Sequence, residues 1–181
     1  MPSLESFDSS YPNAVNHIGV GVDDLDRAIN WYRSVLGFVL LKEAFEVQAS
    51  APYDGAMALD VLGKNFRHMR QAHLVAINGV GIELFQLSDP PHERRIPSLQ
   101  FWTNGFFHIC VTDPDVDKIV SRIAKTGGRQ LSKIWRIHPD VETHRMCYCE
   151  DPFGNIIEIY SHSYEEMHGG ITQPLESGKT R

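Results

Sequence analysis

An internal repeat constrains the fold of this chain more than any other feature of its sequence. An offset of 91 residues carries His17 onto His108, and the residues that follow the two histidines match without a gap. A second offset, of 75 residues, carries Glu83 onto Glu158. Because the offset falls from 91 to 75, the first copy holds 16 more residues in its middle than the second. A duplication of this kind predicts two similar modules that share one core.

Each copy predicts a strand, a helix and then further strands. In the first copy, apolar residues recur at helical spacing from Leu25 to Leu36, after a capping aspartate at position 23 or 24 and before Gly37. The equivalent helix of the second copy spans 115–126 and ends at the pair Gly127-Gly128. The predicted strands are 15–22, 38–45 and a hairpin over 72–87 in the first copy, and 106–112, 130–136 and a hairpin over 145–160 in the second.

The turn of the first hairpin decides where His73 points. A two-residue turn at Asn78-Gly79 pairs His73 with Leu84 and directs it away from Glu83. We therefore interpret His73 as structural. The 16 additional residues of the first copy fall within 48–70, a weakly periodic stretch punctuated by glycine and proline.

The order of elements predicts an α+β fold of two modules in tandem. The first module spans 14–87 and the second spans 105–162. A linker over 88–104, rich in proline and charge, joins them, and a polar C-terminal tail covers 163–181.

Composition and charge exclude several classes of protein. The 181 residues carry a formal net charge of −6 and no basic block, which disfavours nucleic-acid binding and attachment to an anionic membrane. No stretch suits a membrane helix, and the polar first residues do not resemble a signal peptide. Three cysteines form no disulfide framework, so we expect a reducing, cytoplasmic compartment. Cys147 and Cys149 face the same way on a strand, either as soft metal ligands or, as we favour, as two small buried thiols.

Two histidines and two glutamates at equivalent places indicate a metal site. If the modules pair about a pseudo-twofold axis, the equivalent side chains converge on one point: His17, Glu83, His108 and Glu158. Each glutamate lies among strong β-formers, where an unpaired buried carboxylate is costly. A lone strand histidine is usually structural, but four ligand-type residues matched by a repeat favour a shared cation. Two imidazoles and two carboxylates suit one divalent ion of Zn, Ni, Co, Mn or Fe with positions left open for water or substrate.

Other polar and aromatic residues have less specific interpretations. Arg67 and Arg70 suit a substrate carboxylate or phosphate, although a solvated loop face is the favoured interpretation. Three histidines are candidate proton shuttles, with chance proximity as the alternative: His68, His138 and His144. Four aromatic residues are candidates for an apolar pocket wall, with core packing as the default: Phe85, Phe107, Trp135 and Tyr148.

The chain resembles the vicinal oxygen chelate superfamily over roughly 14–162. The most specific segments are 16–20, 28–38, 82–84, 107–109 and 150–158, the last reading EDPFGNIIE. The resemblance implies paired βαβββ modules that form a cupped mixed β-sheet around one divalent metal, often in a homodimer. All four module positions carry His or Glu, as in the branch of glyoxalase I and methylmalonyl-CoA epimerase.

The resemblance to this branch implies a metal-dependent lyase or isomerase that acts on a small carbonyl substrate. The metal chelates two neighbouring substrate oxygens and stabilises an enediolate or enolate, while Glu158, or else Glu83, takes the proton next to the carbonyl. The residues by which glyoxalase I binds glutathione have no match here. Two alternatives stay open: an Fe(II)-dependent dioxygenase of the same superfamily, which would not use Glu83 as a ligand, and a non-catalytic small-molecule binding or resistance protein.

Overall fold

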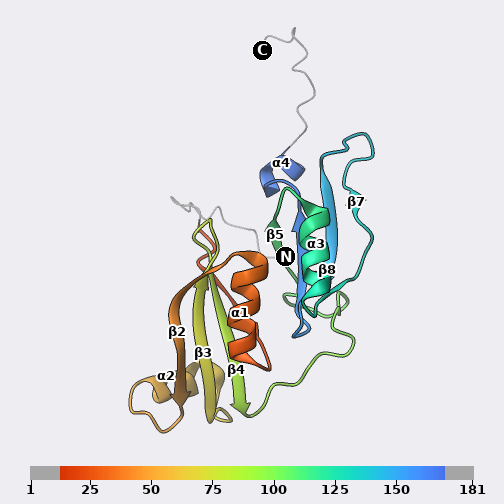
Figure 1. Ribbon diagram of the computed structural model, residues 1–181. Helices are drawn as coiled ribbons and strands as arrows, with labels where there is room; N and C mark the ends of the chain where they lie inside the picture. Colours follow the sequence, from red (N-terminus) through yellow and green to blue (C-terminus); the bar gives the residue numbers. More distant parts are fainter. Residues whose placement is uncertain (1–12, 170–181) are drawn as a thin grey trace, which may run out of the picture.

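The computed structural model describes residues 13–169 and follows the predicted repeat (Figure 1). The first half contains β1 (His17–Gly21), α1 (Leu25–Leu36), β2 (Val39–Gln48), α2 (Asp54–Leu62), β3 (His68–Val75) and β4 (Gly81–Asp89). The second half contains β5 (Ile109–Thr112), α3 (Val116–Lys125), β6 (Arg129–Gln130), β7 (Trp135–Arg136), β8 (Arg145–Glu150) and β9 (Ile156–Tyr160), followed by α4 (Tyr164–His168).

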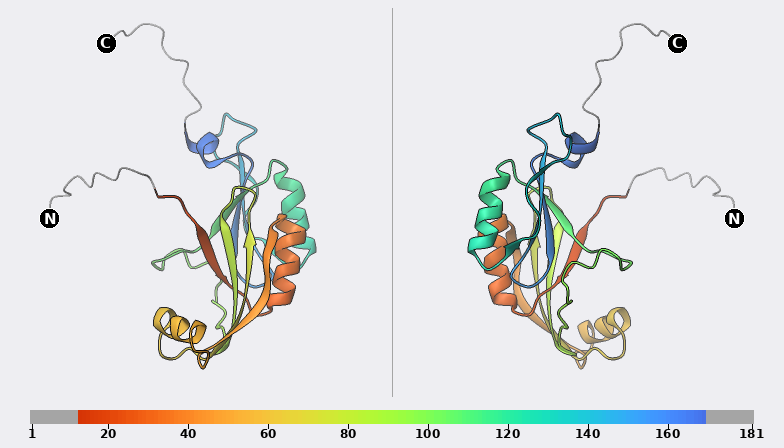
Figure 2. Two further views of the ribbon diagram at one scale, coloured as in Figure 1. Left: turned by 90° about the vertical axis from the view of Figure 1, so that its left-hand side faces the viewer. Right: turned by 90° about the vertical axis from the view of Figure 1, so that its right-hand side faces the viewer.

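Each half forms its own mixed sheet. The first sheet has the strand order β1-β4-β3-β2 and the second has β5-β9-β8-β6, with β7 paired to β8. In both sheets the first strand of the half runs parallel to the last one, and the remaining pairs are antiparallel. Figure 2 shows α1 and α3 side by side on one face of the sheets, with α2 on the opposite side. These paired modules confirm the predicted α+β fold.

The first helix, α1, begins and ends where the sequence predicts. The Asp24 side chain accepts a hydrogen bond from the Arg27 backbone N–H at 3.1 Å, which satisfies one of the free donors of the first turn. Gly37 ends the helix with a φ of 73°, a left-handed conformation that glycine adopts without strain. The buried stripe of α1 comprises Leu25, Ala28, Ile29, Trp31, Tyr32 and Val35.

One hydrophobic core spans both halves, because α1 packs on the first sheet, α3 packs on the second, and the two helices contact each other. Polar contacts also cross this boundary. The buried Tyr32 hydroxyl donates to the Asp151 carboxylate at 2.7 Å, and the Trp31 indole N–H donates to the Thr126 hydroxyl at 2.9 Å. Asp151 also accepts from the backbone N–H of Phe153 at 2.9 Å, which orders the predicted turn between β8 and β9. The halves are therefore joined through α1.

The additional residues of the first copy form a helix that the sequence did not predict. Gly55, in the first turn of α2, lies so close to β2 that a Cβ there would come within 2.4 Å of the Gln48 carbonyl oxygen. This close approach lets Ala58 pack against Val47 and Met69. Packing against the sheet therefore stabilises a helix whose sequence has weak periodicity.

Two other predicted segments differ from the structure. The single strand expected at 130–136 is divided into the short strands β6 and β7. Helix α4 occupies part of the predicted tail, while residues 1–12 and 170–181 lie outside the described part of the chain.

Cys147 and Cys149 are free thiols with no exposed surface, which confirms the interpretation of two small buried residues. Within residues 13–169, no helix has the length and apolar character needed to cross a membrane.

Candidate active site

The strand register reproduces both sequence offsets at the predicted ligands. In the parallel pair β1–β4, Gly19 lies opposite Glu83, and in the pair β5–β9, Cys110 lies opposite Glu158. Gly19 and Cys110 are related by the offset of 91, and the two glutamates by the offset of 75. Each glutamate therefore has the same place in its sheet, on the face turned away from α1 and α3, which we call the open face.

Each half brings together one histidine and one glutamate. The His17 Nε2 atom lies 3.6 Å from a Glu83 carboxylate oxygen, and the His108 Nε2 atom lies 3.2 Å from a Glu158 oxygen. Across residues 13–169, no ion pair joins a histidine of one half to a glutamate of the other, and no group of three or more His, Cys, Asp or Glu side chains is arranged to hold a metal. The structure thus forms two matched pairs, and their convergence on one ion remains a prediction.

The interpretation of His73 as a residue that points away from Glu83 is wrong. The turn of the first hairpin has three residues, 77–79, because the Ala76 backbone N–H donates to the Val80 carbonyl at 2.9 Å. The register moves by one residue, and His73 lies directly opposite Glu83 with its Nε2 atom 3.8 Å from the carboxylate. A shift of one residue reverses the face on which a strand residue lies, so His73 joins the candidate site.

Tyr148 is the counterpart of His73 in the second half. It lies directly opposite Glu158 in the β8–β9 pair, and its ring centroid is 5.4 Å from that of His108. Burial and the negative charge of Glu158 raise the pKa of the Tyr148 hydroxyl above its usual value. The same causes raise the pKa of the Cys110 thiol to about 12 and that of the Tyr160 hydroxyl to about 12. At neutral pH these three groups therefore lie near Glu158 in their protonated form.

A comparison with Glu150 shows how unusual the surroundings of Glu158 are. Both glutamates are 5% exposed. Glu150 is neutralised by Arg129, whose guanidinium donates to it at 2.6 Å, and by Arg94 at 3.6 Å. Within residues 13–169, Glu158 forms no ion pair with a lysine or arginine, and its one ion-pair partner is the imidazole of His108. A buried carboxylate with so little compensating charge fits a cation ligand.

The donor set also fits a divalent metal. The Nδ1 atom of His108 is buried and has no hydrogen-bond partner, so this ring is held by packing and by its contact with Glu158. Within the described residues, neither Glu83 nor Glu158 forms an ion pair with arginine or lysine, so both carboxylates remain available to a metal. Two imidazoles and two carboxylates match the ligands that first-row divalent metals accept.

Several predicted binding residues have other partners. Arg70 forms a bidentate ion pair with Asp26 at 2.9 and 3.0 Å, and Arg67 donates to the carbonyl oxygens of Lys64 and Phe66. Both guanidiniums are thus committed to protein groups. Trp135 is 51% exposed and lies beneath the Lys133 ammonium, so it does not line a pocket with Tyr148. The sequence held no signal for these contacts, because each joins segments far apart in the chain or depends on a loop conformation.

The three candidate proton shuttles also have structural partners. The His138 Nε2 atom is 3.0 Å from the Met167 carbonyl oxygen, and the His144 Nε2 atom is 3.1 Å from the Glu166 carbonyl oxygen. These contacts hold α4 against the second sheet. His68 lies beside Glu46 at 3.6 Å, at the far end of β3 from His73. The structure therefore places all three apart from the His–Glu pairs.

A cavity of about 490 Å³ lies between the two halves. Its lining includes the whole of β1 after His17, the linker arginines Arg94 and Arg95, and the segment that contains Phe107 and His108. Of the four predicted ligands, only His108 borders this cavity. The other three lie on the open faces of the sheets.

Comparison with known proteins identifies the family. The model of the Glyoxalase/Bleomycin resistance protein/Dioxygenase superfamily matches residues 14–159, and the chain belongs to this superfamily. A curated relative, 2-epi-5-epi-valiolone epimerase from Actinomyces sp, is 27% identical over 149 residues, which cover 81% of this chain and 78% of the relative.

Two solved structures show the shared fold. A glyoxalase family protein from Bacillus cereus superposes with a TM-score of 0.67 at 21% identity, over 86% of this chain and 97% of the other. A mutant of the fosfomycin resistance protein FosX from Listeria monocytogenes, in complex with Mn(II) and a dihydroxypropylphosphonic acid, gives a TM-score of 0.53 at 16% identity, over 86% of this chain and 98% of the other. Both similarities support the predicted paired modules.

Proposed function

We propose that this protein is a metal-dependent isomerase that moves a proton on the carbon next to the carbonyl of a small substrate. The observation that carries the proposal is the repetition of one His–Glu pair at the same register in both halves. The resemblance to an epimerase over most of the chain favours isomerisation over lyase chemistry. A purely binding protein would have no need of two such matched pairs.

The proposed metal ligands are the two pairs together: His17, Glu83, His108 and Glu158. A divalent ion bound there supplies Lewis-acid chemistry, because it lowers the energy of negative charge on neighbouring substrate oxygens. The chain itself supplies the groups that move and hold protons. Glu158 is our candidate for the base. Its side chain is 6% exposed and its negative charge faces the imidazole of His108 alone among the histidines, whereas the Glu83 side chain is 25% exposed and faces two histidines.

The duplicated geometry also suits the stereochemistry of an epimerase. Inversion at carbon needs a proton to leave one face and another to arrive at the opposite face. Glu83 and Glu158 come from different sheets, so two carboxylates can approach a substrate from two sides. Tyr148 and Cys110 remain protonated beside Glu158 and can donate hydrogen bonds to substrate oxygens.

The proposal is tested by hydrogen–deuterium exchange at the carbon next to the carbonyl. Candidate 2-oxo and cyclic polyhydroxy ketones are incubated in D2O with the metal-loaded protein, and the incorporated deuterium is measured by NMR and mass spectrometry. We expect exchange that requires the metal and disappears in Glu158→Gln. Metal content measured by plasma mass spectrometry, beside a His108→Ala, Glu158→Ala double variant, tests the ligands separately. Exchange that persists without metal, or a wild type that retains none after reconstitution, would contradict the proposal.

We also propose that the working form is a homodimer. One chain keeps its two His–Glu pairs apart, so a second copy can present the complementary pair to each. The test mixes a His17→Ala, Glu83→Ala variant with a His108→Ala, Glu158→Ala variant and measures metal content. We expect the mixture to regain metal that neither variant binds alone, and a mixture that stays metal-free would exclude a site shared between copies.

A further inference from the structure

The open faces of the two halves can be compared residue by residue because their registers match. Next to the pair His73–Glu83 the first half has Gln71–Phe85 and then Met69–Leu87. Next to the pair Tyr148–Glu158 the second half has Met146–Tyr160, and the rings of His144 and His162 stack beyond it with centroids 4.6 Å apart. Beyond the glutamates, the first face is therefore mainly apolar, with Gln71 as its polar member 2.9 Å from the His73 ring, and the second face carries hydroxyl and imidazole groups.

The apolar face begins directly beside Glu83. Phe85 lies two residues further along β4, and its ring covers β1 at Gly19, where a Cβ would come within 3.2 Å of it. Phe45 lies opposite Gln71, and its ring centroid is 5.5 Å from that of His73. Both phenylalanines keep part of their surface exposed. A mainly apolar floor, formed by Phe45 and Phe85 on either side of Gln71, thus adjoins the proposed metal ligand Glu83.

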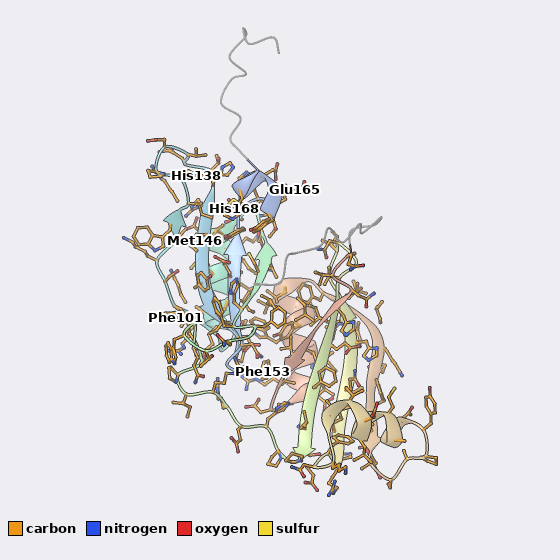
Figure 3. All side chains as sticks on the ribbon, turned by 180° about the vertical axis from the view of Figure 1, so that it is seen from behind. Phe101, His138, Met146, Phe153, Glu165 and His168 are labelled. Atoms are coloured by element: carbon orange, nitrogen blue, oxygen red, sulfur yellow. The ribbon has the colours of Figure 1, made fainter. Side chains whose placement is uncertain are left out.

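Helix α2 closes the far end of this floor. Its Ala58, together with Phe66, packs over Met69 and Val47, and all four residues are buried. Phe45, Phe85 and Leu87 pack against the edge of this cluster. Figure 3, seen from behind, shows α2 across one end of the first sheet, whereas Met146, His138 and His168 lie at the other end of the molecule. The second half has no counterpart of α2, since the 16 additional residues belong to the first copy alone.

The spacing of the strand limits what fits on this floor. From Glu83 to Phe85 the strand advances about 7 Å, at roughly 3.3 Å per residue, and by Leu87 the surface belongs to the α2 cluster. An uncovered length of about 7 Å matches one phenyl ring or a chain of about four carbons. The Lys42 ammonium lies 3.8 Å from the Phe45 ring centroid, and an arm that binds this ring face displaces the flexible lysine side chain.

We infer that the substrate carries an apolar arm of about one phenyl ring beside its reacting carbon, that Phe45 and Phe85 bind this arm, and that α2 limits its length. This inference rests on the proposed function, because Glu83 is one of the proposed ligands of the metal beside which the reacting carbon lies. It assigns to the additional residues of the first copy a role in specificity. A polyhydroxylated substrate without such an arm would leave the floor in contact with water.

The first test compares mandelate with lactate, which have the same neighbouring oxygens but differ in a phenyl or methyl arm. Titration calorimetry on the metal-loaded protein gives both dissociation constants. We expect mandelate to bind at least about tenfold more tightly than lactate, and this preference to fall below about threefold in Phe45→Ser. The control is Phe101→Ser, which removes a phenylalanine that is 68% exposed elsewhere and keeps the preference. Equal affinities in the wild type, or an unchanged preference in Phe45→Ser, would overturn the inference.

A second test does not depend on the metal or on catalysis. Benzyl alcohol is added to the metal-free protein, and its binding is followed by saturation-transfer NMR. We expect a signal from the aromatic protons in the wild type and in Phe101→Ser, and its loss in Phe45→Ser. If the two acids fail to bind but benzyl alcohol gives this pattern, the metal proposal fails and the arm site stands. If lactate binds and benzyl alcohol gives no Phe45-dependent signal, the arm site fails and the metal proposal stands.

Discussion

The two halves of this chain keep the same backbone frame around one His–Glu pair and differ in what surrounds it. In the first half Glu83 has two imidazoles, a more exposed carboxylate and an apolar floor that ends at α2. In the second half Glu158 is buried beside one imidazole and the protonated side chains of Tyr148 and Cys110. After a duplication, the two copies can therefore keep the same His–Glu pair while the residues around the pair diverge to serve different steps of binding and catalysis. We assign proton transfer mainly to the second half and recognition of an apolar arm to the first.

The glycines that follow the first helix of each half give a second lesson. Gly37 and Gly128 are related by the offset of 91, yet only Gly37 has a positive φ, of 73°. In the second half Gly127 takes that conformation, with a φ of 95°. Gly128 instead permits close packing, since a Cβ there would lie 2.5 Å from the Glu150 carbonyl oxygen. The same residue type at the same repeat position thus serves two physical needs.

The largest expected effect concerns the two glutamates. We expect Glu158→Gln to lower the rate of deuterium exchange by about a thousandfold or more, as for loss of a general base, and Glu83→Gln to lower it less. The reason is that Glu158 is buried and its carboxylate faces one histidine, whereas the carboxylate of Glu83 is more exposed and faces two. Single-turnover rates on metal-loaded variants measure the difference. An equal or larger loss in Glu83→Gln would assign the base to the first half.

The next effect compares Gly128→Ala with Gly37→Ala. We expect Gly128→Ala to lower the free energy of unfolding by about 3 kcal/mol, because its methyl group would overlap backbone at Glu150. Gly37→Ala has open space around its Cβ and should cost about 1 kcal/mol, for the left-handed backbone alone. Urea denaturation of both variants measures the two changes. Equal values would show that the backbone near Glu150 can move.

A smaller effect, dependent on pH, distinguishes Glu150 from Glu158. Burial would raise the pKa of Glu150, but the hydrogen bonds from Arg129 and Ser98 outweigh it and hold this pKa below its usual 4.5. The ionised Glu150 therefore stabilises the folded protein above pH 4.5, and this contribution is lost as the pH falls through the lowered pKa of Glu150 in the folded state. We expect Glu150→Gln to cost about 2 kcal/mol at pH 7 and progressively less below pH 4.5, as measured by denaturation at several pH values. A cost that does not change with pH would show that packing, and not charge, holds this residue.

The smallest expected effect tests where the halves are alike. Asp24 and Asp115 each cap a helix by accepting a hydrogen bond from a backbone N–H at 3.1 Å. We expect Asp24→Ala and Asp115→Ala to cost about 1 kcal/mol each, because both remove one cap bond at an exposed site. Thermal or urea denaturation gives both values. If the two losses of unfolding free energy differ by more than about 1 kcal/mol, one of the aspartates stabilises the fold through more than its cap hydrogen bond.

Much of the frame could be predicted from local patterns. The limits of α1, its Asp24 cap and its Gly37 ending follow from helical periodicity and from the backbone preferences of these residues. The equivalence of Glu83 with Glu158 follows from the repeat, and the matching registers of the two sheets confirm it. These features depend on residues close in the chain or on comparing the chain with itself, so no knowledge of packing is needed.

The amino-acid sequence by itself determined the duplication, the first helix of each half and the equivalence of the two histidines and of the two glutamates. Only the tertiary structure decided that His73 faces Glu83, because a single extra residue in the 77–79 turn reverses the side on which it lies. It also decided that residues 54–62 form a helix, since docking at Gly55 and burial of Ala58 stabilise a segment with little helical periodicity of its own. The pairing of Arg129 with Glu150 likewise joins strands that are separated in the chain, and such contacts depend on how the sheets pack. Local preferences act within a few residues, whereas register, docking and charge pairing are set by the whole fold.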